Sequence, residues 1–423
     1  MPFFTQANPP TVEQLKSWQL DKGTLINTPV PGFRASVAVA GLRKDGRIDV
    51  GLIASDKPVP VAAVFTQNKV PAAPVQVARQ HLGGKLASAI LANCGGANAS
   101  TGQPGLDACI STCQTTAKAL NVPPGQIFPC STGVIGQLNE LAPRINACVP
   151  NLAAKLKAEG LSSVARAIMT TDAFAKMAEA KLMLNNKSVT IVGMAKGAGM
   201  IRPDMATMLA FVLTDAEIDQ PDLQKITHQA SSISFNRASV DGDTSTNDTL
   251  LVLASGRAGN GPLDENALAD LQAAISEVCQ KLAAMLIMDG EGAQHLILVR
   301  VKGAASAPQA DESCYAVAHS PLCKTAFNGC DPNWGRLLQT LGAVAARNDF
   351  PLQPDRTNVN IGGVDLAVNG LYAGREAEQK VAAIMQEKIY DITLNLNLGE
   401  HSFWIFTNDL GHEYIRINAD YRS

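Results

Sequence analysis

Charged residues are scarce in this chain of 423 residues, and neither sign dominates. Asp, Glu, Lys and Arg together make up 17% of the residues, and their formal net charge is −3. Without a basic excess, the composition favours neither nucleic acid nor an anionic membrane surface as a partner. The apolar runs are short and interrupted, and none approaches the roughly eighteen residues that a membrane-spanning helix needs. We therefore expect no nucleic-acid partner and no membrane partner.

Cysteine and histidine are scattered rather than clustered. The nine cysteines contain no C-x-x-C pair and the six histidines no H-E-x-x-H, so we expect no metal site. An odd number of cysteines in a chain of this length favours reduced thiols in a cytoplasm over a disulfide framework. The first ten residues lack the basic and apolar regions of a secretory signal, which also favours the cytoplasm. Cys109 and Cys113 have helix spacing and are expected to be buried apolar residues of one helical face.

Hydrophobic patterning predicts strands in groups, with helices between and after them. Strands are expected at residues 35–40, 50–54, 61–65, 89–92, 126–130, 181–184, 189–194, 207–213, 250–254, 296–301, 392–398, 403–407 and 414–417. Helices are expected near residues 105–120, 137–157, 221–235, 264–288 and 376–387, and residues 303–310 have the composition of a linker. This order is typical of an α/β protein with α+β layering rather than a strict βαβ repeat.

A glycine-rich segment that runs into an apolar strand carries the most specific signal. It reads Met194-Ala-Lys-Gly-Ala-Gly-Met-Ile-Arg-Pro-Asp-Met-Ala-Thr-Met-Leu-Ala-Phe211. Its junction, Ala206-Thr207, places a small residue before a hydroxyl at the start of a strand. If that peptide bond breaks, Thr207 gains an α-amine, whose pKa of roughly 7.7–8.0 suits a general base at neutral pH. Nucleophile and base would then belong to one residue. Without such a cut, Thr207 is an ordinary strand residue.

Six further motifs accompany this segment along the chain. They are Ser131-Thr-Gly-Val-Ile-Gly136, Ala167-Ile-Met-Thr-Thr-Asp172, Ser234-Phe-Asn-Arg-Ala-Ser-Val-Asp-Gly-Asp-Thr-Ser-Thr-Asn-Asp248, Asp289-Gly-Glu-Gly-Ala293, Asp331-Pro-Asn-Trp-Gly-Arg336 and Asn418-Ala-Asp-Tyr-Arg-Ser423. In this order, over nearly the whole chain, the sequence resembles the ornithine acetyltransferase family, the glutamate N-acetyltransferases of the cyclic arginine pathway. The resemblance implies stacked β-sheets with flanking helices. It also implies cleavage into an α chain, residues 1–206, and a β chain, residues 207–423.

The resemblance also implies roles for individual residues. Thr207 is the nucleophile, and Thr132 and Gly133 form the oxyanion hole. The substrate-binding residues that it implies are Lys196, Thr207, Glu291, Asn418, Ser423 and one of Thr170 and Thr171; spacing leaves open which threonine. Taken alone, Thr132-Gly133 is a plain turn after a strand.

Residue chemistry is compatible with these roles. Gly133 lets a backbone N–H approach an oxyanion closely. Lys196 suits a substrate carboxylate, and Glu291, which we expect its flanking glycines to expose, suits the ammonium of acetylornithine. Taken alone, Glu291 is an ordinary surface residue. The strand-like pattern near Asn418 indicates that the chain end is tied down near a site.

The activity that the resemblance implies is acetyl transfer from N-acetylornithine to glutamate through an acetyl-Thr207 ester, with ping-pong kinetics, after self-cleavage at Ala206-Thr207. No cofactor is implied, and acetyl-CoA stays open as a second donor. The implied assembly is a heterotetramer of two α and two β chains. Two alternatives stay open: an N-terminal-nucleophile aminopeptidase or amidohydrolase, with water as the acceptor, and an unprocessed, non-catalytic metabolite-binding relative.

Several positions depart from the family pattern. Cys94, Gly96, Ala173, Arg202, Asp204, Gln294 and His295 stand where Ser, Asn, Thr, His, Asn, Thr and Lys are usual. None of these changes removes a catalytic group. We expect Arg202 and Asp204, which precede the scissile bond, to bear on the rate of processing, and Cys94 and Gly96 to bear on the shape of a pocket wall.

Overall fold

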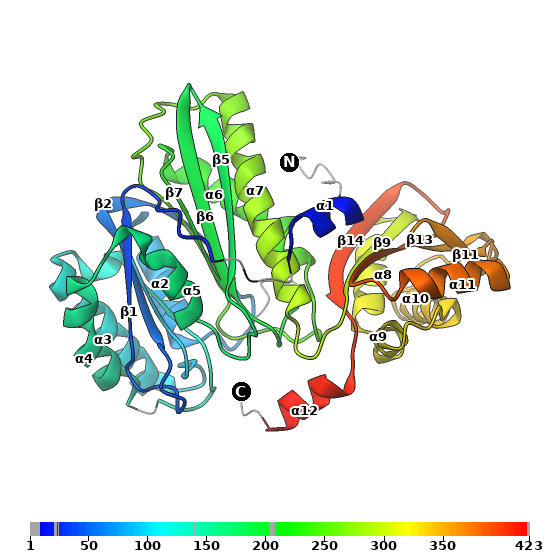
Figure 1. Ribbon diagram of the computed structural model, residues 1–423, viewed down its shortest axis with the longest axis horizontal. Helices are drawn as coiled ribbons and strands as arrows, with labels where there is room; N and C mark the ends of the chain where they lie inside the picture. The colour runs from blue at the N-terminus through cyan, green and yellow to red at the C-terminus, as the bar shows by residue number, and fades with distance from the viewer. Residues whose placement is uncertain (1–8, 21–22, 24, 139, 203–207, 421–423) are drawn as a thin grey trace. The chain divides into compact units, whose positions relative to one another are not determined.

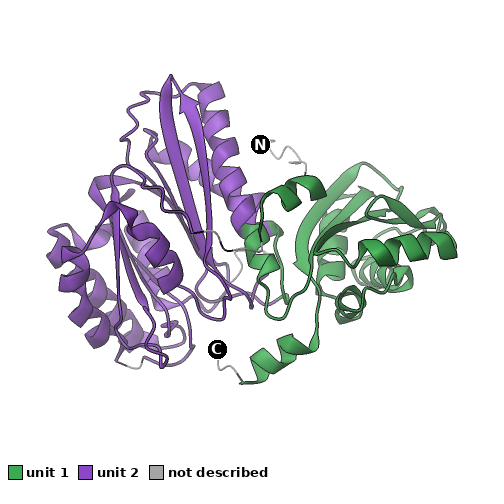
Figure 2. Ribbon diagram, viewed as in Figure 1, with its two compact units in different colours: residues 1–21, 237–242, 283–421 green, residues 22–236, 243–282, 422–423 purple. Residues whose placement is uncertain are grey.

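The computed structural model describes residues 9–20, 23, 25–138, 140–202 and 208–420 (Figure 1). The chain divides into two compact units, coloured separately in Figure 2. Unit 1 comprises residues 1–21, 237–242 and 283–421, and unit 2 comprises residues 22–236, 243–282 and 422–423. Ala206, Thr207 and Ser423 lie outside the described residues. The division into chains 1–206 and 207–423 therefore stays a prediction.

Unit 2 is built on a mixed eight-stranded sheet with the order β4-β3-β2-β8-β7-β6-β5, to which β1 adds by pairing with β2. Its strands are β1 (Phe33–Ala38), β2 (Val50–Phe65), β3 (Leu86–Asn93), β4 (Ile127–Ser131), β5 (Lys176–Leu184), β6 (Lys187–Lys196), β7 (Leu209–Thr214) and β8 (Thr249–Ala254). Its helices are α2 (Ala73–Leu82), α3 (Gly102–Leu120), α4 (Leu141–Ala154), α5 (Leu161–Ala167), α6 (Gln220–Ser232) and most of α7 (Glu265–Met288). The pairs β3–β4 and β7–β8 run parallel.

Strands from both halves of this sheet share one apolar core. Buried side chains of β1 to β4, such as Phe128, cluster with those of β5 to β8, such as Phe211. The two halves therefore stack across a common core, as expected from the sequence. On another face, Cys109 and Cys113 of α3 are buried in a second cluster with residues of α4, which confirms their predicted apolar role.

Helix α7 covers β6 at unusually close range. A side chain at Gly193 of β6 would place its Cβ 2.6 Å from a methyl carbon of Val278, so only glycine admits the helix there. Helix α7 is long and apolar enough to cross a membrane, but 61% of its most apolar stretch of 18 residues is buried within the fold. Such burial is typical of a core helix.

Unit 1 is built on a six-stranded sheet with the order β12-β11-β10-β13-β9-β14. Its strands are β9 (Leu296–Ala304), β10 (Asn358–Ile361), β11 (Val364–Val368), β12 (Leu371–Tyr372), β13 (Ile389–Asn395) and β14 (His401–Asn408). Its helices are α1 (Val12–Ser17), α8 (Ala307–His319), α9 (Pro321–Asn328), α10 (Trp334–Asn348), α11 (Arg375–Ile384) and α12 (His412–Asp420). Helix α8 packs on β9 and β14, and the core between them includes Val317 and Ile405.

Three sequence expectations are corrected by these elements. Residues 303–310 are not a linker, because β9 continues to Ala304 and α8 begins at Ala307, with the hydroxyl of Ser306 accepting a hydrogen bond from the Gln309 N–H as its N-cap. Residues 414–417 are helical, within α12, rather than a strand. The two strands expected at 50–54 and 61–65 are one strand, β2, interrupted by a shift of register between Ala54 and Val59.

Candidate active site

The predicted oxyanion turn follows β4 and is pinned against the loop that follows β3. The Thr132 N–H donates to the Asn93 carbonyl at 3.0 Å. Gly133 has φ +124°, and a Cβ there would lie 2.7 Å from backbone atoms of Gly95 and Gly96. Glycine is therefore required by both conformation and space. Within the described part of the chain, the Gly133 N–H makes no hydrogen bond, so this donor is available to a ligand oxygen.

Lys196, at the end of β6, contacts this turn directly. Its Nζ donates to Thr132 Oγ1 at 3.0 Å, and the two residues are only 2% and 5% exposed. A hydroxyl has one donor and two acceptor sites. Because Lys196 occupies an acceptor site, the Thr132 hydrogen remains available for a further acceptor. The structure thus brings together two residues that the sequence placed in different roles.

Asp172 links the Thr170 turn to the end of β6. Its carboxylate pairs with Lys176 Nζ at 2.6 Å and accepts from the Gly197 N–H at 2.7 Å and the Thr170 N–H at 2.9 Å. Burial raises the pKa of Asp172, but the charges of Lys176 and then Lys196 outweigh it and hold the pKa well below its usual range. Asp172 is therefore a fixed negative charge beneath the site.

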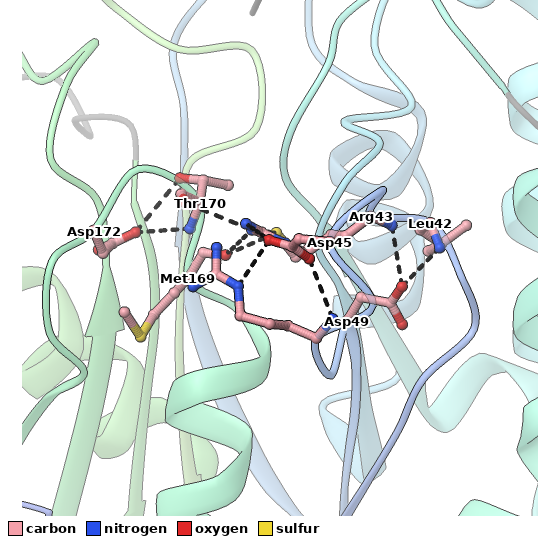
Figure 3. A network of polar contacts seen from close by, with 9 residues as sticks. Leu42, Arg43, Asp45, Asp49, Met169, Thr170 and Asp172 are labelled. Atoms are coloured by element: carbon pink, nitrogen blue, oxygen red, sulfur yellow. Dashed lines mark hydrogen bonds and ion pairs between the residues drawn. The ribbon is translucent and has the colours of Figure 1, made fainter. Parts of the chain in front are cut away.

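Sequence reasoning did not select Asp172, although it closes the motif that contains both candidate threonines. A carboxylate at a fixed spacing from them was the available signal. Thr170 also directs its hydroxyl toward Asp172, at 3.4 Å (Figure 3). Thr171 is half-buried, and its side chain makes no hydrogen bond to another described residue. Both threonines stay candidates for the substrate contact.

The chain immediately after Thr207 is fixed by a second buried carboxyl group. The Met208 N–H donates to Asp248 Oδ1 at 3.0 Å, and the next residue, Leu209, pairs with Thr249 in the parallel ladder of β7 and β8. Asp248 is fully buried, and this burial raises its pKa well above the usual range despite the bond from Met208. Sequence reasoning quoted the motif that ends in Asp248 but gave this residue no role.

The neighbouring residue, Asn247, joins the same motif to the oxyanion turn. Its Nδ2 donates to the Ser131 carbonyl at 2.8 Å and to the Ala97 carbonyl at 2.6 Å. Asn247 is 6% exposed, so both bonds are made away from water. Consecutive residues therefore connect the turn after β4 with the start of β7. The end of this motif, Asn247 and Asp248, is therefore an element of site architecture.

In unit 1, Glu291 and Asn418 contact each other. Asn418 Nδ2 donates to Glu291 Oε2 at 2.6 Å, which places the two predicted substrate-binding residues together. Glu291 is only 9% exposed, so the expectation that its glycines expose it was wrong. The glycines instead permit close packing, because a Cβ at Gly290 would lie 2.1 Å from the Asn408 side chain and one at Gly292 would lie 2.7 Å from the Tyr414 nitrogen.

The departures from the family pattern fall in different surroundings. Cys94 is buried, and its Sγ donates to the Met169 carbonyl at 2.8 Å, so it lies behind the wall formed by that segment. Ala173 and Arg202 are exposed, and Asp204 lies outside the described residues. The backbone N–H groups of Gln294 and His295 both donate to Asp409 Oδ1, in a structural turn.

A metal centre is not apparent in the described part of the chain. No group of three or more His, Cys, Asp or Glu side chains there is placed to hold an ion. The polar groups that converge near the oxyanion turn are a hydroxyl, a backbone N–H and an ammonium, which are hydrogen-bond donors. Such a set suits an oxygen that gains negative charge.

Comparison with known proteins identifies the family. The ArgJ family model matches residues 34–423. Arginine biosynthesis bifunctional protein ArgJ of Geobacter sulfurreducens is 41% identical over 396 residues, which cover 93% of this chain and 100% of that protein. Its namesake from Desulfotalea psychrophila is 42% identical over 397 residues, with the same two coverages.

The solved structures that match include arginine biosynthesis bifunctional protein ArgJ from Bacillus halodurans, with 35% sequence identity and a TM-score of 0.46. The match covers 50% of this chain and 98% of that chain. The family match spans most of the chain, and both curated relatives are matched along their full length. The expectation from the motifs is confirmed: this chain belongs to the ArgJ family.

Proposed function

We propose that this protein transfers the acetyl group of N2-acetyl-L-ornithine to L-glutamate through an ester on Thr207, and that acetyl-CoA serves as a second acetyl donor. Membership of a family whose relatives are named bifunctional proteins of arginine biosynthesis supports the proposal. The observation that carries it is the contact between Lys196 and Thr132 beside the available Gly133 N–H. These groups suit the negative oxygen of an acyl-transfer intermediate.

Maturation comes first in this proposal. The Thr207 hydroxyl attacks the carbonyl carbon of Ala206, the C–N bond breaks, and an ester forms on the Thr207 oxygen. Water then hydrolyses that ester and leaves a carboxylate on Ala206 and a free α-amine on Thr207. The hydrogen bond from Met208 to Asp248 supports this step, because it fixes the chain one residue beyond the scissile bond. The resulting chains, 1–206 and 207–423, are proposed to assemble as a heterotetramer of two of each.

Turnover uses the same hydroxyl twice. The Thr207 amine takes the hydroxyl proton, and the oxygen attacks the acetyl carbon of N-acetylornithine. The amide C–N bond breaks, and ornithine leaves with a proton returned from the amine. The glutamate amine then attacks the acetyl ester, the ester C–O bond breaks, and the proton lost by the glutamate nitrogen passes through the Thr207 amine to the Thr207 oxygen. In both halves the oxyanion accepts hydrogen bonds from Gly133 N–H and Thr132 Oγ–H. Lys196 favours this orientation, since its ammonium occupies an acceptor site of Thr132.

Substrate binding is carried over from the family residue by residue. Lys196 is proposed for the substrate carboxylate, since an ammonium has three donors and its bond to Thr132 uses one. Glu291, held by Asn418, is proposed for the side-chain ammonium of acetylornithine. Ser423 and one of Thr170 and Thr171 complete the proposed set.

The reaction is proposed to need no cofactor and to take place in the cytoplasm. Each step of acetyl transfer uses only the Thr207 amine and hydroxyl, the oxyanion donors, the acetyl donor and glutamate. The cytoplasm is proposed because the cysteines are odd in number and scattered along the chain, which favours a reducing compartment.

Intact mass measured with and without acetylornithine tests both stages. Wild type should give two chains divided at Ala206-Thr207, and the 207–423 chain should gain one acetyl group. Thr207→Ala should stay uncut and unlabelled, whereas Thr207→Ser retains a hydroxyl and should be cut. An uncut, unlabelled wild-type chain would favour a non-catalytic binding protein. Acetate released without glutamate as fast as acetylglutamate forms with it would favour the hydrolase alternative.

A further inference from the structure

A cavity of about 410 Å³ opens beside the Thr170 turn, within unit 2. Its charged lining consists of three arginines, Arg43, Arg47 and Arg166, and its apolar lining includes Met169 and Phe174. The acetyl transfer proposed above uses none of these side chains. A cavity with a cationic side and an apolar side suits a ligand that carries both an anionic and an apolar part.

The charges around this cavity do not cancel. Asp45 pairs with Arg43 and with Arg47, each at 2.8 Å. Arg166 is exposed and makes no ion pair with any described residue. Among the charged lining side chains and their ion-pair partners, three guanidinium groups face one carboxylate, which is an excess of two positive charges. Guanidinium groups bind phosphate oxygens in a planar, two-pronged fashion, so this excess favours a phosphorylated ligand over a neutral one.

The cavity wall and the candidate active site share one segment of chain. Arg43 donates to the Met169 carbonyl at 2.8 Å and to Cys94 Sγ at 3.3 Å, which fixes the start of that segment (Figure 3). Met169 and Ala173 line the cavity. Between them, Thr170 and Asp172 are bonded to each other, and Asp172 also accepts from the Gly197 N–H, next to Lys196. A ligand in the cavity therefore lies against the turn that supports the acyl-transfer groups.

We propose that this cavity binds the phosphorylated nucleotide part of acetyl-CoA. This inference rests on the proposed function, because it gives the second acetyl donor a binding site of its own. The two excess positive charges would face the phosphates, and the apolar lining would face the adenine or the pantetheine arm. N-acetylornithine has no phosphate, so it would not depend on these arginines. In the reaction, the thioester C–S bond breaks as the Thr207 oxygen bonds to the acetyl carbon, and the thiol leaves with the hydroxyl proton.

The test compares two donors in one set of variants. Arg47→Glu/Arg166→Glu reverses the excess charge, from two positive to two negative charges, and leaves Arg43, which holds the Met169 segment, in place. The matched control is Arg34→Glu, because Arg34 also forms an exposed ion pair, with Asp56 at 3.2 Å, and lies outside the cavity lining. Initial rates are measured with glutamate and either acetyl-CoA or N-acetylornithine, and the binding of CoA, 3′,5′-ADP and ADP is measured by calorimetry.

The double variant should raise the KM for acetyl-CoA at least about tenfold, since it removes hydrogen bonds to charged groups. Its KM for N-acetylornithine should match that of Arg34→Glu. CoA should bind wild type more tightly than ADP and should bind the double variant weakly. An unchanged KM for acetyl-CoA would overturn the inference. The inference would also be overturned if ADP bound wild type as tightly as CoA does while the double variant still turned over acetyl-CoA. That result would indicate a site for a nucleotide regulator.

The same assays separate this inference from the proposed function. If wild type transfers acetyl groups from N-acetylornithine but neither uses acetyl-CoA nor binds CoA, only the inference fails. If wild type transfers from neither donor, the proposed function fails.

Discussion

Gly133→Ala tests the oxyanion turn against a control in the same loop. At Gly133, with φ +124°, the added Cβ would lie 2.7 Å from backbone atoms of Gly95 and Gly96. Non-bonded carbons prefer about 3.5–4.0 Å, so the turn has to move by about 1 Å. At Gly136, with φ +79°, an added Cβ meets nothing within 4 Å. Gly136→Ala therefore carries backbone strain without displacement of the turn.

The two variants should differ in activity far more than in stability. An unfavourable φ should cost about 1–2 kcal/mol of unfolding free energy in Gly136→Ala and about 1–3 kcal/mol in Gly133→Ala. A donor displaced by about 1 Å no longer meets the distance that oxyanion stabilisation requires. We therefore expect kcat of Gly133→Ala to fall by about 10²–10³-fold, whereas kcat of Gly136→Ala should stay near that of wild type.

The assay is acetyl transfer from N-acetylornithine to glutamate by processed enzyme, with urea unfolding of both variants. Intact mass gives the processed fraction, so that a cleavage defect is not mistaken for slow turnover. If kcat of processed Gly133→Ala lies within about threefold of Gly136→Ala, the Gly133 N–H does not serve the oxyanion. If Gly133→Ala does not fold, Thr132→Val removes the neighbouring hydroxyl donor and should lower kcat by a similar factor.

Three further predictions concern buried carboxyl groups. Asp172→Asn should lower the unfolding free energy by about 3–5 kcal/mol, because it leaves the Lys176 ammonium buried without its charge partner. A decrease of less than about 1 kcal/mol in a urea titration would contradict this, and the conservative variant Asp172→Glu is the control. Asp248 has a raised pKa in the folded state, so its ionisation at higher pH opposes folding. The stability of Asp248→Asn relative to wild type, measured as the difference in unfolding free energy, should therefore be greater at pH 7.5 than at pH 4.5. The reverse order would refute the assignment. Glu291→Gln keeps an acceptor for Asn418 but removes the negative charge. The KM for N-acetylornithine should therefore rise about tenfold or more, while the KM for glutamate changes less. Equal changes in the two KM values would exclude an ammonium-specific role.

The sequence predicted several of the elements that are strongly apolar or strongly periodic. Strands β6, β7 and β8 and the long helix α7 all begin and end within two residues of where they were expected, whereas β5 begins five residues earlier than expected. In each, burial on at least one face imposes a clear pattern. The turn after β4 was also expected, because Thr132-Gly133 directly follows an apolar strand.

Helix α12, which was expected as a strand, lacks such a pattern, whereas α10 has one, with Leu337, Leu341 and Val344 buried, and was still not expected. In α12, the residues of intermediate exposure are Tyr414 and Ile417, while Ile415 is 64% exposed. Because no face of α12 is buried, its apolar residues also fit the alternating pattern of a strand. Only the three-residue spacing of the less exposed side chains indicates a helix. Ser306 likewise belonged to a segment that has a linker's composition, although small polar residues are also what helix N-caps require.

The family motifs led to Lys196, Thr132 and Gly133, but not to the groups that hold them. Asp172, Asn247 and Asp248 act through contacts between segments that are far apart in the chain, such as the bonds of Asn247 to the turn after β4. No spacing rule within one segment could predict those contacts. The environment of Glu291 was mistaken for the same reason, since the partners that bury it come from distant residues.

The pairing of β6 with β7 has a consequence for the protein after the proposed cut. Six residue pairs, from Ile191–Thr214 to Lys196–Leu209, join strands that flank the predicted scissile bond. Cleavage of that bond would break the covalent link between the strands but leave the hydrogen-bonded pairing of β6 with β7 intact, so two polypeptides would share one sheet. Neither could dissociate without exposing strand edges and the core beneath them. The nicked protein should then melt in a single cooperative transition for unit 2, with the Met208 N–H still bonded to Asp248.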